Sequence, residues 1–294
     1  MVTAMKTIRS LIADRIQSDR VVKEIRREDR ISMIYRSHPA LEKIDEGLVD
    51  IRKQKLMAAM EGDKDSAAPL AKREEELLKE RERYISDKGI DPSFDEVKEL
   101  CPKCHDTGFV TTKSGNKAVC GNCMKDELAE CYASSGMADY SSYTLKSFDF
   151  GYINGIDRKS VFNKIKKIFE DGYEGPFLMV YSSPSQTGKT YLSVVLTKYA
   201  IIEGRSAYFS KAEWFEDRDL AEDGSVNECD FLVIDDYSAA ITNNRKTASH
   251  INKILEIRSA ASKPTLMVST EALETLVAES DSRIAGKLSK AGRI

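Results

Sequence analysis

The sequence predicts an α/β fold in which a parallel sheet follows an all-helical segment and a small cysteine-rich module. Apolar runs at 177–181 and 231–234 have the length and composition of buried strands, and helical stretches separate them. Residues 1–89 repeat apolar side chains at helical spacing and contain few strand formers. Two Cys-x-x-Cys pairs lie between these regions. We therefore expect three parts, a helical segment at 1–89, a module at 90–135 and an α/β domain at 136–294.

Composition places the chain among folded proteins without a membrane span. Of its 294 residues, 41% are hydrophobic and 32% charged, which is too apolar for a disordered chain. No run of 18 apolar residues occurs, and Lys6, Arg9 and Asp14 interrupt the stretch where a signal peptide would be apolar. We expect a cytoplasmic, reducing location, where the six cysteines favour metal ligands or free thiols over disulfides. The net charge of −3 gives no global nucleic-acid signature, so any DNA contact would be a local patch.

The first 89 residues predict three helices. His38-Pro39 interrupts the first, because proline disfavours helical backbone in the residue before it, and this proline can open the second. After a polar break, Pro69 and Gly89 are suited to opening and closing the third helix. Residues 1–37 contain nine Lys or Arg against five Asp or Glu. A solvated face is the ordinary explanation of such charge, and DNA binding by the first helix is the alternative.

The cysteine spacing is the least ambiguous motif. Two Cys-x-x-Cys pairs fifteen residues apart suit a tetrahedral structural zinc, and four sulfur ligands leave no position for a catalytic water. Short apolar pairs at 109–110 and 118–119 predict a hairpin between them. His105 and Cys131 are possible substitutes for one cysteine, and Cys229 suits a small buried residue beside a strand. The predicted zinc ligands are Cys101, Cys104, Cys120 and Cys123.

The stretch 182–190 has the context of a phosphate-binding loop of the Walker A kind. A buried strand runs into it, and a predicted helix at 190–202 follows. Backbone N–H groups of such a loop face phosphates, its lysine neutralises the outer phosphates, and its threonine holds Mg²⁺. Serine and glutamine replace the usual glycines at two positions, which bears on how tightly ATP binds and whether it is hydrolysed. The predicted nucleotide-binding residues are Ser183, Pro184, Ser185, Gln186, Thr187, Gly188, Lys189, Thr190 and Tyr191.

The acid pair after the run 231–234 predicts the other half of the site. A buried parallel strand would present Asp235 to hold Mg²⁺ together with Thr190, and Asp236 to orient and deprotonate an attacking water. Such a run is a weak signal alone, but here it follows a Gly-Lys-Thr loop. The next predicted strand, 265–270, ends in hydroxyls and suits a polar sensor beside the γ-phosphate.

The remaining segments continue the α/β alternation. We expect the aromatic stretch 143–150 to pack in the core, with coverage of an adenine ring as a weaker alternative. Trp214, the single tryptophan, is expected in the core rather than at a site. No strand is expected after Leu288. A strand is predicted at 206–210, and helices at 157–171, 211–221, 247–261, 271–277 and 282–291.

The order of these parts resembles the bacterial replicative helicase loaders of the DnaC/DnaI type, relatives of the IstB transposition ATPases within the AAA+ class. The resemblance is clearest from about 143 to 288. Cys-Pro-Lys-Cys-His-Asp-Thr-Gly at 101–108 is similar to the zinc module of DnaI-like proteins, which IstB relatives usually lack. The other matching stretches are 187–192, 232–236, 251–254 with Arg258 and Pro264-Thr265, and 283–288.

This resemblance implies an AAA+ P-loop domain that binds ATP, contacts single-stranded DNA and self-associates. It also implies N-terminal helices and a zinc module that grip a hexameric replicative DNA helicase. A basic residue of one subunit would complete the ATP site of the next. The family's arginine maps onto Lys287, which supplies charge without a bidentate fork, and Arg283 one turn earlier could serve instead. The family's sensor asparagine maps onto Thr270.

Three hypotheses remain open from the sequence. The intact motif lysine, threonine and acid pair favour a helicase-loading ATPase with weak, partner-stimulated hydrolysis. The departures from the family pattern favour an adaptor or inhibitor that has lost turnover, and an IstB-like transposition ATPase is the third reading. The departures are at Ser183, Gln186, Thr270 and Lys287. The predicted catalytic set is Lys189, Asp236, Thr270, Arg283 and Lys287.

Overall fold

The computed structural model describes residues 7–62, 67–112, 115–170, 175–216, 224–238 and 244–294. The chain forms two compact units: one combines Met1–Asp14 with Thr107–Ile294, and the other is Arg15–Asp106. Among the helices of the described residues, none has both the length and the apolar character needed to cross a bilayer. The functional division at 1–89, 90–135 and 136–294 stays a prediction.

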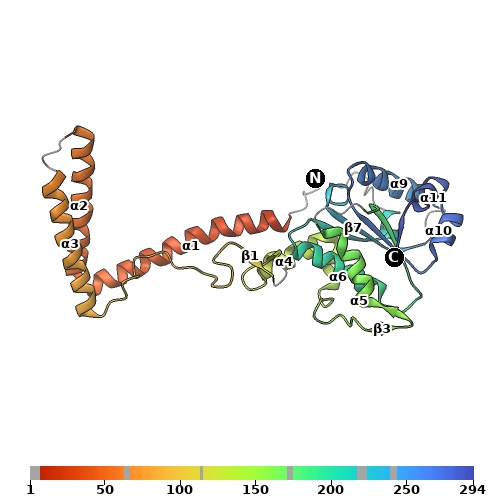
Figure 1. Ribbon diagram of the computed structural model, residues 1–294, viewed down its shortest axis with the longest axis horizontal. Coiled ribbons are helices and arrows are strands. Elements are labelled where there is room, and N and C mark those ends of the chain that lie inside the picture. The colour runs from red at the N-terminus through yellow and green to blue at the C-terminus, as the bar shows by residue number, and fades with distance from the viewer. Residues whose placement is uncertain (1–6, 63–66, 113–114, 171–174, 217–223, 239–243) are drawn as a thin grey trace. The chain divides into compact units, whose positions relative to one another are not determined.

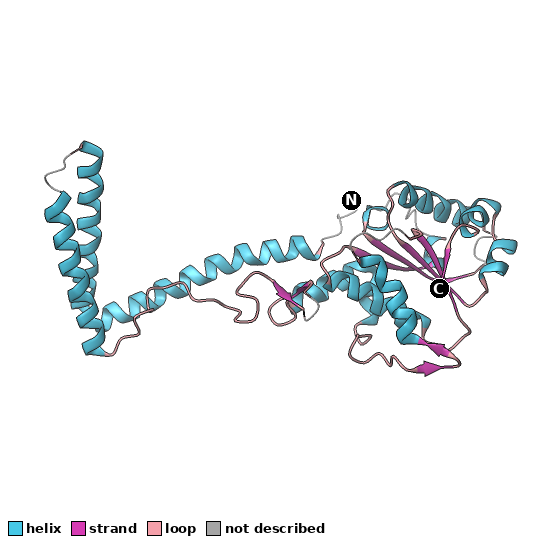
Figure 2. Cartoon of the chain, viewed as in Figure 1, coloured by secondary structure: helices cyan, strands magenta, loops and turns pink. Residues whose placement is uncertain are grey.

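The three predicted N-terminal helices are confirmed. They are α1 (Ile8–Ser37), α2 (Pro39–Glu61) and α3 (Ala67–Lys88), which Figure 2 shows in cyan. Gly62 ends α2 with a left-handed φ of 73°, and Gly89 follows α3 with a φ of 63°, the conformation that favours glycine at a helix end. Helix α3 starts two residues before Pro69.

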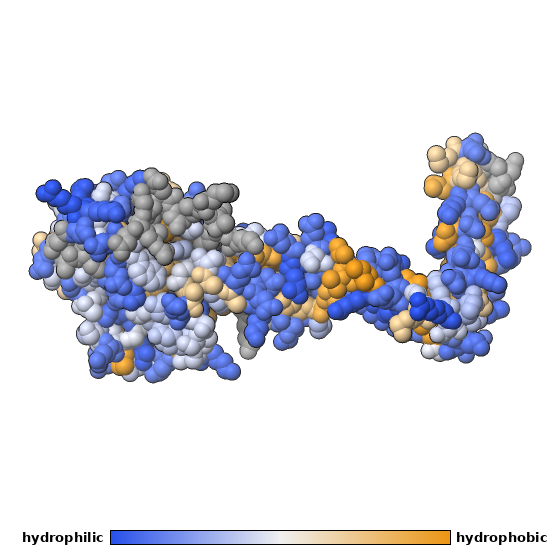
Figure 3. Space-filling model, turned by 180° about the vertical axis from the view of Figure 1, so that it is seen from behind, coloured by the Kyte–Doolittle hydropathy of each residue, from blue (hydrophilic) through white to orange (hydrophobic). Residues whose placement is uncertain are grey.

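Small apolar clusters and ion pairs hold the unit Arg15–Asp106 together. Arg81 bridges Asp45 and Asp95, with N-to-O distances of 2.6 Å to each. One cluster lies between α2 and α3 and consists of Ile44, Leu48, Ile51 and Leu77. A second cluster joins these helices to the residues after α3 and consists of Leu41, Ile85, Ile90 and Phe94. Hydrophobic surface remains on the helices (Figure 3), where the exposed apolar residues include Val21, Ile25, Met33, Val49, Leu56, Met57 and Met60.

A hairpin and a helix lead into the α/β domain. As predicted, β1 (Phe109–Thr111) pairs antiparallel with β2 (Lys117–Val119). Helix α4 (Lys125–Tyr132) continues through the turns η1 (Ala133–Met137) and η2 (Ala138–Tyr140). Gly136 in η1 has a φ of 80°, and a Cβ there would lie 2.0 Å from the carbonyl oxygen of Phe209 in strand β6 (Ala207–Lys211). Only glycine therefore fits where this segment crosses the sheet.

The predicted parallel sheet is confirmed. Its strand order is β6-β7-β8-β5-β9, and every pairing is parallel. The expectation that no strand follows Leu288 is wrong, because the two residues of β9 pair with β5, with Gly292 opposite Met179. The strands are β5 (Leu178–Ser182), β6 (Ala207–Lys211), β7 (Phe231–Tyr237), β8 (Thr265–Ser269) and β9 (Gly292–Arg293).

Helices cover both faces of this sheet (Figure 1). The crossover from β5 to β6 runs toward one edge and all later crossovers run toward the other, so right-handed connections place their helices on opposite faces. This reversal at β5 is the topological switch point at which open α/β sheets bind ligands. One face carries α5 (Arg158–Lys166) and α6 (Lys189–Ile202), and the other carries α9 (Arg245–Ala260), α10 (Leu273–Glu279) and α11 (Ser282–Leu288). The smaller elements are β3 (Tyr152–Ile153), β4 (Ile156–Asp157) and α7 (Gly224–Glu228).

Three predictions for this domain need correction. The predicted helix at 211–221 is only a 3₁₀ turn, η4 (Ala212–Phe215), in the described part, and residues 217–221 lie outside the described residues. The helix predicted at 157–171 is α5 followed by a 3₁₀ turn, η3 (Lys167–Phe169), and residue 171 lies outside the description. Trp214 is half-buried, because it lies on the η4 turn with its ring edge-on to Phe209, at 6.2 Å between centroids.

Candidate nucleotide site and metal centre

The loop 183–188 joins the carboxyl end of β5 to the start of α6. Its first residue, Ser183, donates its backbone N–H to the carbonyl oxygen of Ser269 at 3.2 Å, which fixes the loop to the end of β8. At the other end, Leu192 donates to the Gly188 carbonyl at 2.9 Å as the first turn of α6. The positive end of a 14-residue helix therefore follows the loop directly, which favours a phosphate there.

Two residues of this loop have left-handed backbone. Gly188, at a φ of 81°, adopts it without cost, whereas Gln186, at 62°, is held there at roughly 1 kcal/mol. Ser183 is not among the described residues with positive φ. Its buried hydroxyl instead lies 2.7 Å from the Thr187 hydroxyl. The two missing glycines thus differ, because only Gln186 strains the backbone.

The motif lysine is folded back over its own loop. Lys189 donates from Nζ to the carbonyl oxygen of Pro184 at 2.7 Å, and only 8% of the residue is exposed. Burial lowers the pKa of Lys189, and the carboxylates of Asp235 and Asp236 oppose that shift. A phosphate oxygen is a stronger acceptor for an ammonium group than a neutral carbonyl, so this side chain is suited to exchanging partners.

Asp235 supplies a buried carboxylate beside α6. Ser193 donates to its Oδ1 at 3.4 Å, and the Thr190 side chain also hydrogen bonds to it. Burial raises the pKa of Asp235. Its Oδ2 is buried and has no hydrogen-bond partner among the described residues. An unpaired carboxylate oxygen next to a threonine hydroxyl is the oxygen donor set that Mg²⁺ prefers, so Thr190 and Asp235 fit the predicted ion.

Asp236 lies at the exposed end of β7 and contacts a residue that the sequence reasoning missed. Its side chain is 53% exposed, its φ is 52°, and its carboxylate lies 3.5 Å from Nζ of Lys211. Burial alone would lower the pKa of Lys211, but Tyr140, Asp236 and Glu213 together raise it, so the lysine stays charged. Lys211 is the last residue of β6 and lies in register opposite Asp235 of β7. This pairing between strands places it at the site, and no local sequence motif predicts such a pairing.

The other predicted catalytic residues have different surroundings. Thr270 is exposed and follows the last residue of β8. Arg283 forms an ion pair with Asp281 at 2.9 Å, and Lys287 forms one with Glu256 at 3.3 Å. Both basic side chains are therefore engaged with acids of α9 and of the start of α11 rather than with the loop of their own chain.

The aromatic stretch 143–150 packs on the last predicted loop residue, Tyr191. The Tyr191 ring stacks on Tyr143 with centroids 4.2 Å apart and planes at 6°, and its hydroxyl lies 2.8 Å from that of Ser147. Phe148 lies 5.1 Å from the same ring and is buried, as the core-packing prediction expects. Tyr191 thus anchors this stretch to the first turn of α6.

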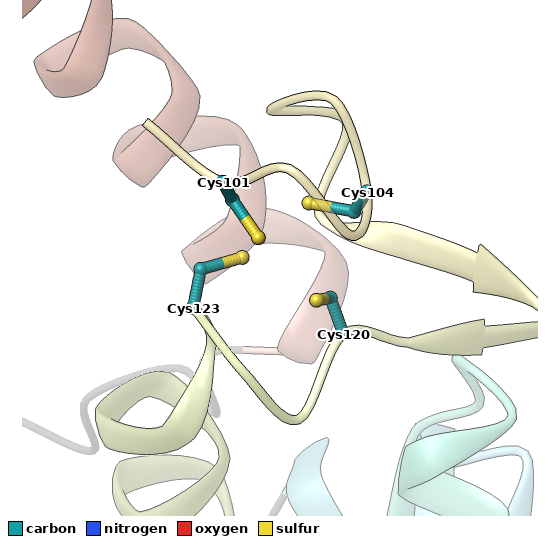
Figure 4. A group of neighbouring side chains, drawn as sticks. All are labelled: Cys101, Cys104, Cys120 and Cys123. Atoms are coloured by element: carbon teal, nitrogen blue, oxygen red, sulfur yellow. The ribbon is translucent and has the colours of Figure 1, made fainter. Parts of the chain in front are cut away.

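The four predicted zinc ligands come together. Their sulfur atoms all lie within 4.8 Å of one another and point toward a common centre (Figure 4). Four thiols at this separation fit a tetrahedral zinc. Neither predicted substitute belongs to this group of described residues: His105 pairs with Glu99 at 2.8 Å, and burial raises the pKa of the Cys131 thiol to about 11. Cys229 is buried, as predicted.

Comparison with known proteins gives one curated relative. The replicative helicase loader DnaC of Buchnera aphidicola subsp. Acyrthosiphon pisum (strain APS) is 25% identical over 211 residues, which are 66% of this chain and 80% of the relative. No protein-family model matches the sequence.

Solved structures give weaker similarities, and the three described here are each 18% identical to this chain. A DNA replication initiation factor has a TM-score of 0.42 over 52% of this chain and 48% of its own, so the chain spans about half of that structure. AMPPCP-bound DnaA from Aquifex aeolicus has a TM-score of 0.43 over 52% of this chain and 50% of its own. The structure of DnaI has a TM-score of 0.41 over 51% of this chain and 89% of its own.

The curated match and the motifs agree. Three features carry the resemblance to the helicase loaders, and all three are present in the structure. They are the phosphate-binding loop, the Asp-Asp strand on the same parallel sheet and the four-cysteine cluster. Together with these motifs, the comparison shows that the chain is similar to the replicative helicase loader DnaC over 80% of that relative's length.

Proposed function

We propose that this chain is an ATP-binding loader of a replicative DNA helicase, with ATP hydrolysis that is slow alone and stimulated by its partners. The observation that carries the proposal is the placement of the buried Asp235 carboxylate against Thr190 and Ser193 of the helix that follows the phosphate-binding loop. The similarity to DnaC over 80% of that relative supports helicase loading as the purpose of this nucleotide site.

Each residue of the site would act at a separate step. Lys189 would leave the Pro184 carbonyl and pair with the outer phosphates, while backbone N–H groups of 183–191 bind the phosphate chain. Thr190 and Asp235 would hold Mg²⁺, which neutralises phosphate charge when bound. Asp236 would accept the proton of the attacking water, and Thr270 would serve as the polar sensor.

A second copy of the chain would complete the site. Phosphoryl transfer requires positive charge opposite the γ-phosphate, and a basic side chain supplied by a neighbouring subunit can provide it. Arg283, with 49% of its side chain exposed, and Lys287, with 26%, are the proposed donors on α11. Self-association would exchange their acidic partners for the nucleotide of the next subunit.

The N-terminal parts would bind the helicase. Exposed apolar side chains on α1 and α2 support docking of a protein on segment 1–89, and the cysteine module at 90–135 would be stiffened by zinc. Domain 136–294 would bind nucleotide and contact single-stranded DNA, in the cytoplasm. The basic composition of 1–37 leaves DNA binding by α1 as an additional proposal.

A second candidate is an adaptor that binds ATP without hydrolysing it. One observation favours it: the carboxylate of Asp236 lies 3.5 Å from the ammonium group of Lys211, so it faces a cation of its own chain rather than an attacking water. An IstB-like transposition role would instead require binding to a transposase, and stable co-purification with a replicative helicase alone would contradict it.

An ATPase assay decides between loader and adaptor. Phosphate release is measured for the native chain, Lys189→Ala and Asp236→Asn, each with a replicative helicase and single-stranded DNA. We expect stimulated release from the native chain and background release from both variants. Equal background from all three, with ATP binding retained by the native chain, would overturn the loader ATPase and leave the adaptor.

A further inference from the structure

Arg158 is a buried basic residue next to the phosphate-binding loop, and no sequence motif points to it. It is the first residue of α5, and only 9% of it is exposed. Burying a guanidinium is unfavourable unless its N–H groups find partners, so the surroundings of this side chain should explain its position.

The protein contacts of Arg158 use only part of the guanidinium. Nη2 donates to the Asp149 carboxylate at 3.0 Å, and Nε donates to the Gly151 carbonyl at 3.4 Å, which is long. The Phe148 ring lies 5.3 Å from the guanidinium carbon. Asp149 is 75% exposed, and an ion pair with a solvated carboxylate contributes little stability. Nη1 has no hydrogen-bond partner among the described residues.

That third nitrogen faces the loop. A Cβ placed on Gly188 would lie 3.3 Å from Nη1 of Arg158, so Nη1 lies close against the loop backbone and a larger residue at 188 would crowd it. Gly188 directly precedes Lys189, and the loop is therefore flanked by two cationic side chains, one from α6 and one from α5. A buried guanidinium with a free N–H edge beside a phosphate-binding loop is arranged for an anion.

We propose that Arg158 is a nucleotide-binding residue that donates from Nη1 to a phosphate of ATP or ADP on the Gly188 side of the loop. The Gly151 carbonyl and the Phe148 ring hold the guanidinium in this orientation and leave Nη1 for the nucleotide. This proposal rests on the ATP binding proposed above. Arg158 would then contribute to affinity for both nucleotides, in contrast to a residue supplied by a second copy, which acts on the γ-phosphate of ATP.

The test is equilibrium binding of fluorescently labelled ATP and ADP to the full chain. Arg158→Gln keeps a donor for Asp149 but removes the charge and the fork. Lys159→Gln, on the exposed neighbouring position, is the matched control for loss of one positive charge from the same helix. Asp149→Asn removes the ion pair and keeps the guanidinium. Thermal melting by circular dichroism establishes that each variant folds.

We expect Arg158→Gln to weaken ATP and ADP binding by about ten- to a hundredfold, the loss typical of a charge-assisted hydrogen bond. Lys159→Gln and Asp149→Asn should stay within about twofold of the native chain, because neither removes that bond.

Unchanged binding by Arg158→Gln would overturn the inference and leave the proposed function intact. Equal loss in Arg158→Gln and Asp149→Asn would also overturn it, since the ion pair would then be structural. Absence of nucleotide binding by the native chain would instead contradict the proposed function itself. If Arg158→Gln does not fold, Arg158→Lys replaces it, and native affinity in that variant would overturn a role for the guanidinium fork.

Discussion

The two compact units of this chain are held together in different ways. The unit with the sheet contains a large apolar cluster of described residues, in which strand residues such as Ile234 and Met267 and helix residues such as Ile251 and Ile254 are fully buried. The unit Arg15–Asp106 has two clusters of four described residues each, and ion pairs join its helices. The first unit has a core of its own, whereas the second buries little.

This difference in packing suits the two units to the different tasks that the proposed function gives them. A sheet unit with a large core can hold the carboxylate of Asp235 and the loop in fixed geometry, as a nucleotide site requires. The thin helical unit leaves apolar side chains such as Leu56, Met57 and Met60 exposed, which a monomeric surface rarely does in quantity. On the proposed function the second unit is a surface for a protein partner, and four experiments test the contrast between the two units.

Metal removal should have the largest effect, because four sulfur ligands from two separate chain segments would share one ion in the cysteine cluster. Free energies of structural zinc binding are on the order of 10 kcal/mol, and the hairpin β1–β2 has only three residues per strand. We expect Cys101→Ser with Cys104→Ser to remove hydrogen-exchange protection at 107–120 and to abolish helicase binding, while nucleotide binding persists. Helicase binding retained by the double variant would contradict the assignment of the module to that partner.

Core truncation should distinguish the two units next. Ile254→Ala in the large cluster should cost toward the upper end of about 2–5 kcal/mol, because close packing on all sides prevents collapse of the cavity. Leu48→Ala in the helical unit should cost toward the lower end, since a two-helix hairpin can close around the gap. Urea unfolding of each variant measures both. Equal losses would show that the helical unit is as tightly packed as the sheet unit.

Ion pairs in the helical unit should contribute to the free energy of unfolding where they are shielded from solvent. Arg81 is only 18% exposed and bridges Asp45 and Asp95, so Arg81→Gln should cost about 1–2 kcal/mol. Arg52 is 59% exposed and pairs with Glu74, so the matched Arg52→Gln should cost less than about 0.5 kcal/mol. Thermal melting of both variants at low and high salt measures the two losses. An Arg52→Gln loss as large as that of Arg81→Gln would show that exposed pairs also hold this unit.

Substitution in the phosphate-binding loop should give the smallest of these effects, and it should increase rather than decrease ATP affinity. Gln186→Gly removes a left-handed non-glycine residue and should improve ATP affinity by about 1 kcal/mol at most, by making the bound backbone conformation easier to hold. Ser183→Gly is the control, because it relieves no positive φ and loses the contact with Thr187. Equilibrium ATP binding measures both. Tighter binding by Ser183→Gly alone would show that the strain at residue 186 has no effect.

The sequence predicted the parts of the site that one chain segment carries by itself. The loop, its helix and the Asp-Asp strand are each contiguous, so their residues could be read in order, and the cysteine spacing did the same for the metal cluster. Lys211 and Arg158 were missed because their roles depend on pairing across strands and on packing of α5 against the loop. The strand β9 was missed because two residues carry no apolar alternation, and its pairing with β5 defines it.

Gly136 links the cysteine module's helix to the chemistry of the site through a single strand. Any side chain at this position would push the segment after α4 against the Phe209 carbonyl, and close-packed interiors pass such a displacement on rather than absorb it. Phe209 is two residues from Lys211, the partner of Asp236, on the same strand. A displacement of the segment after α4 would thus reach Lys211 along strand β6, and through its ion pair the carboxylate of Asp236.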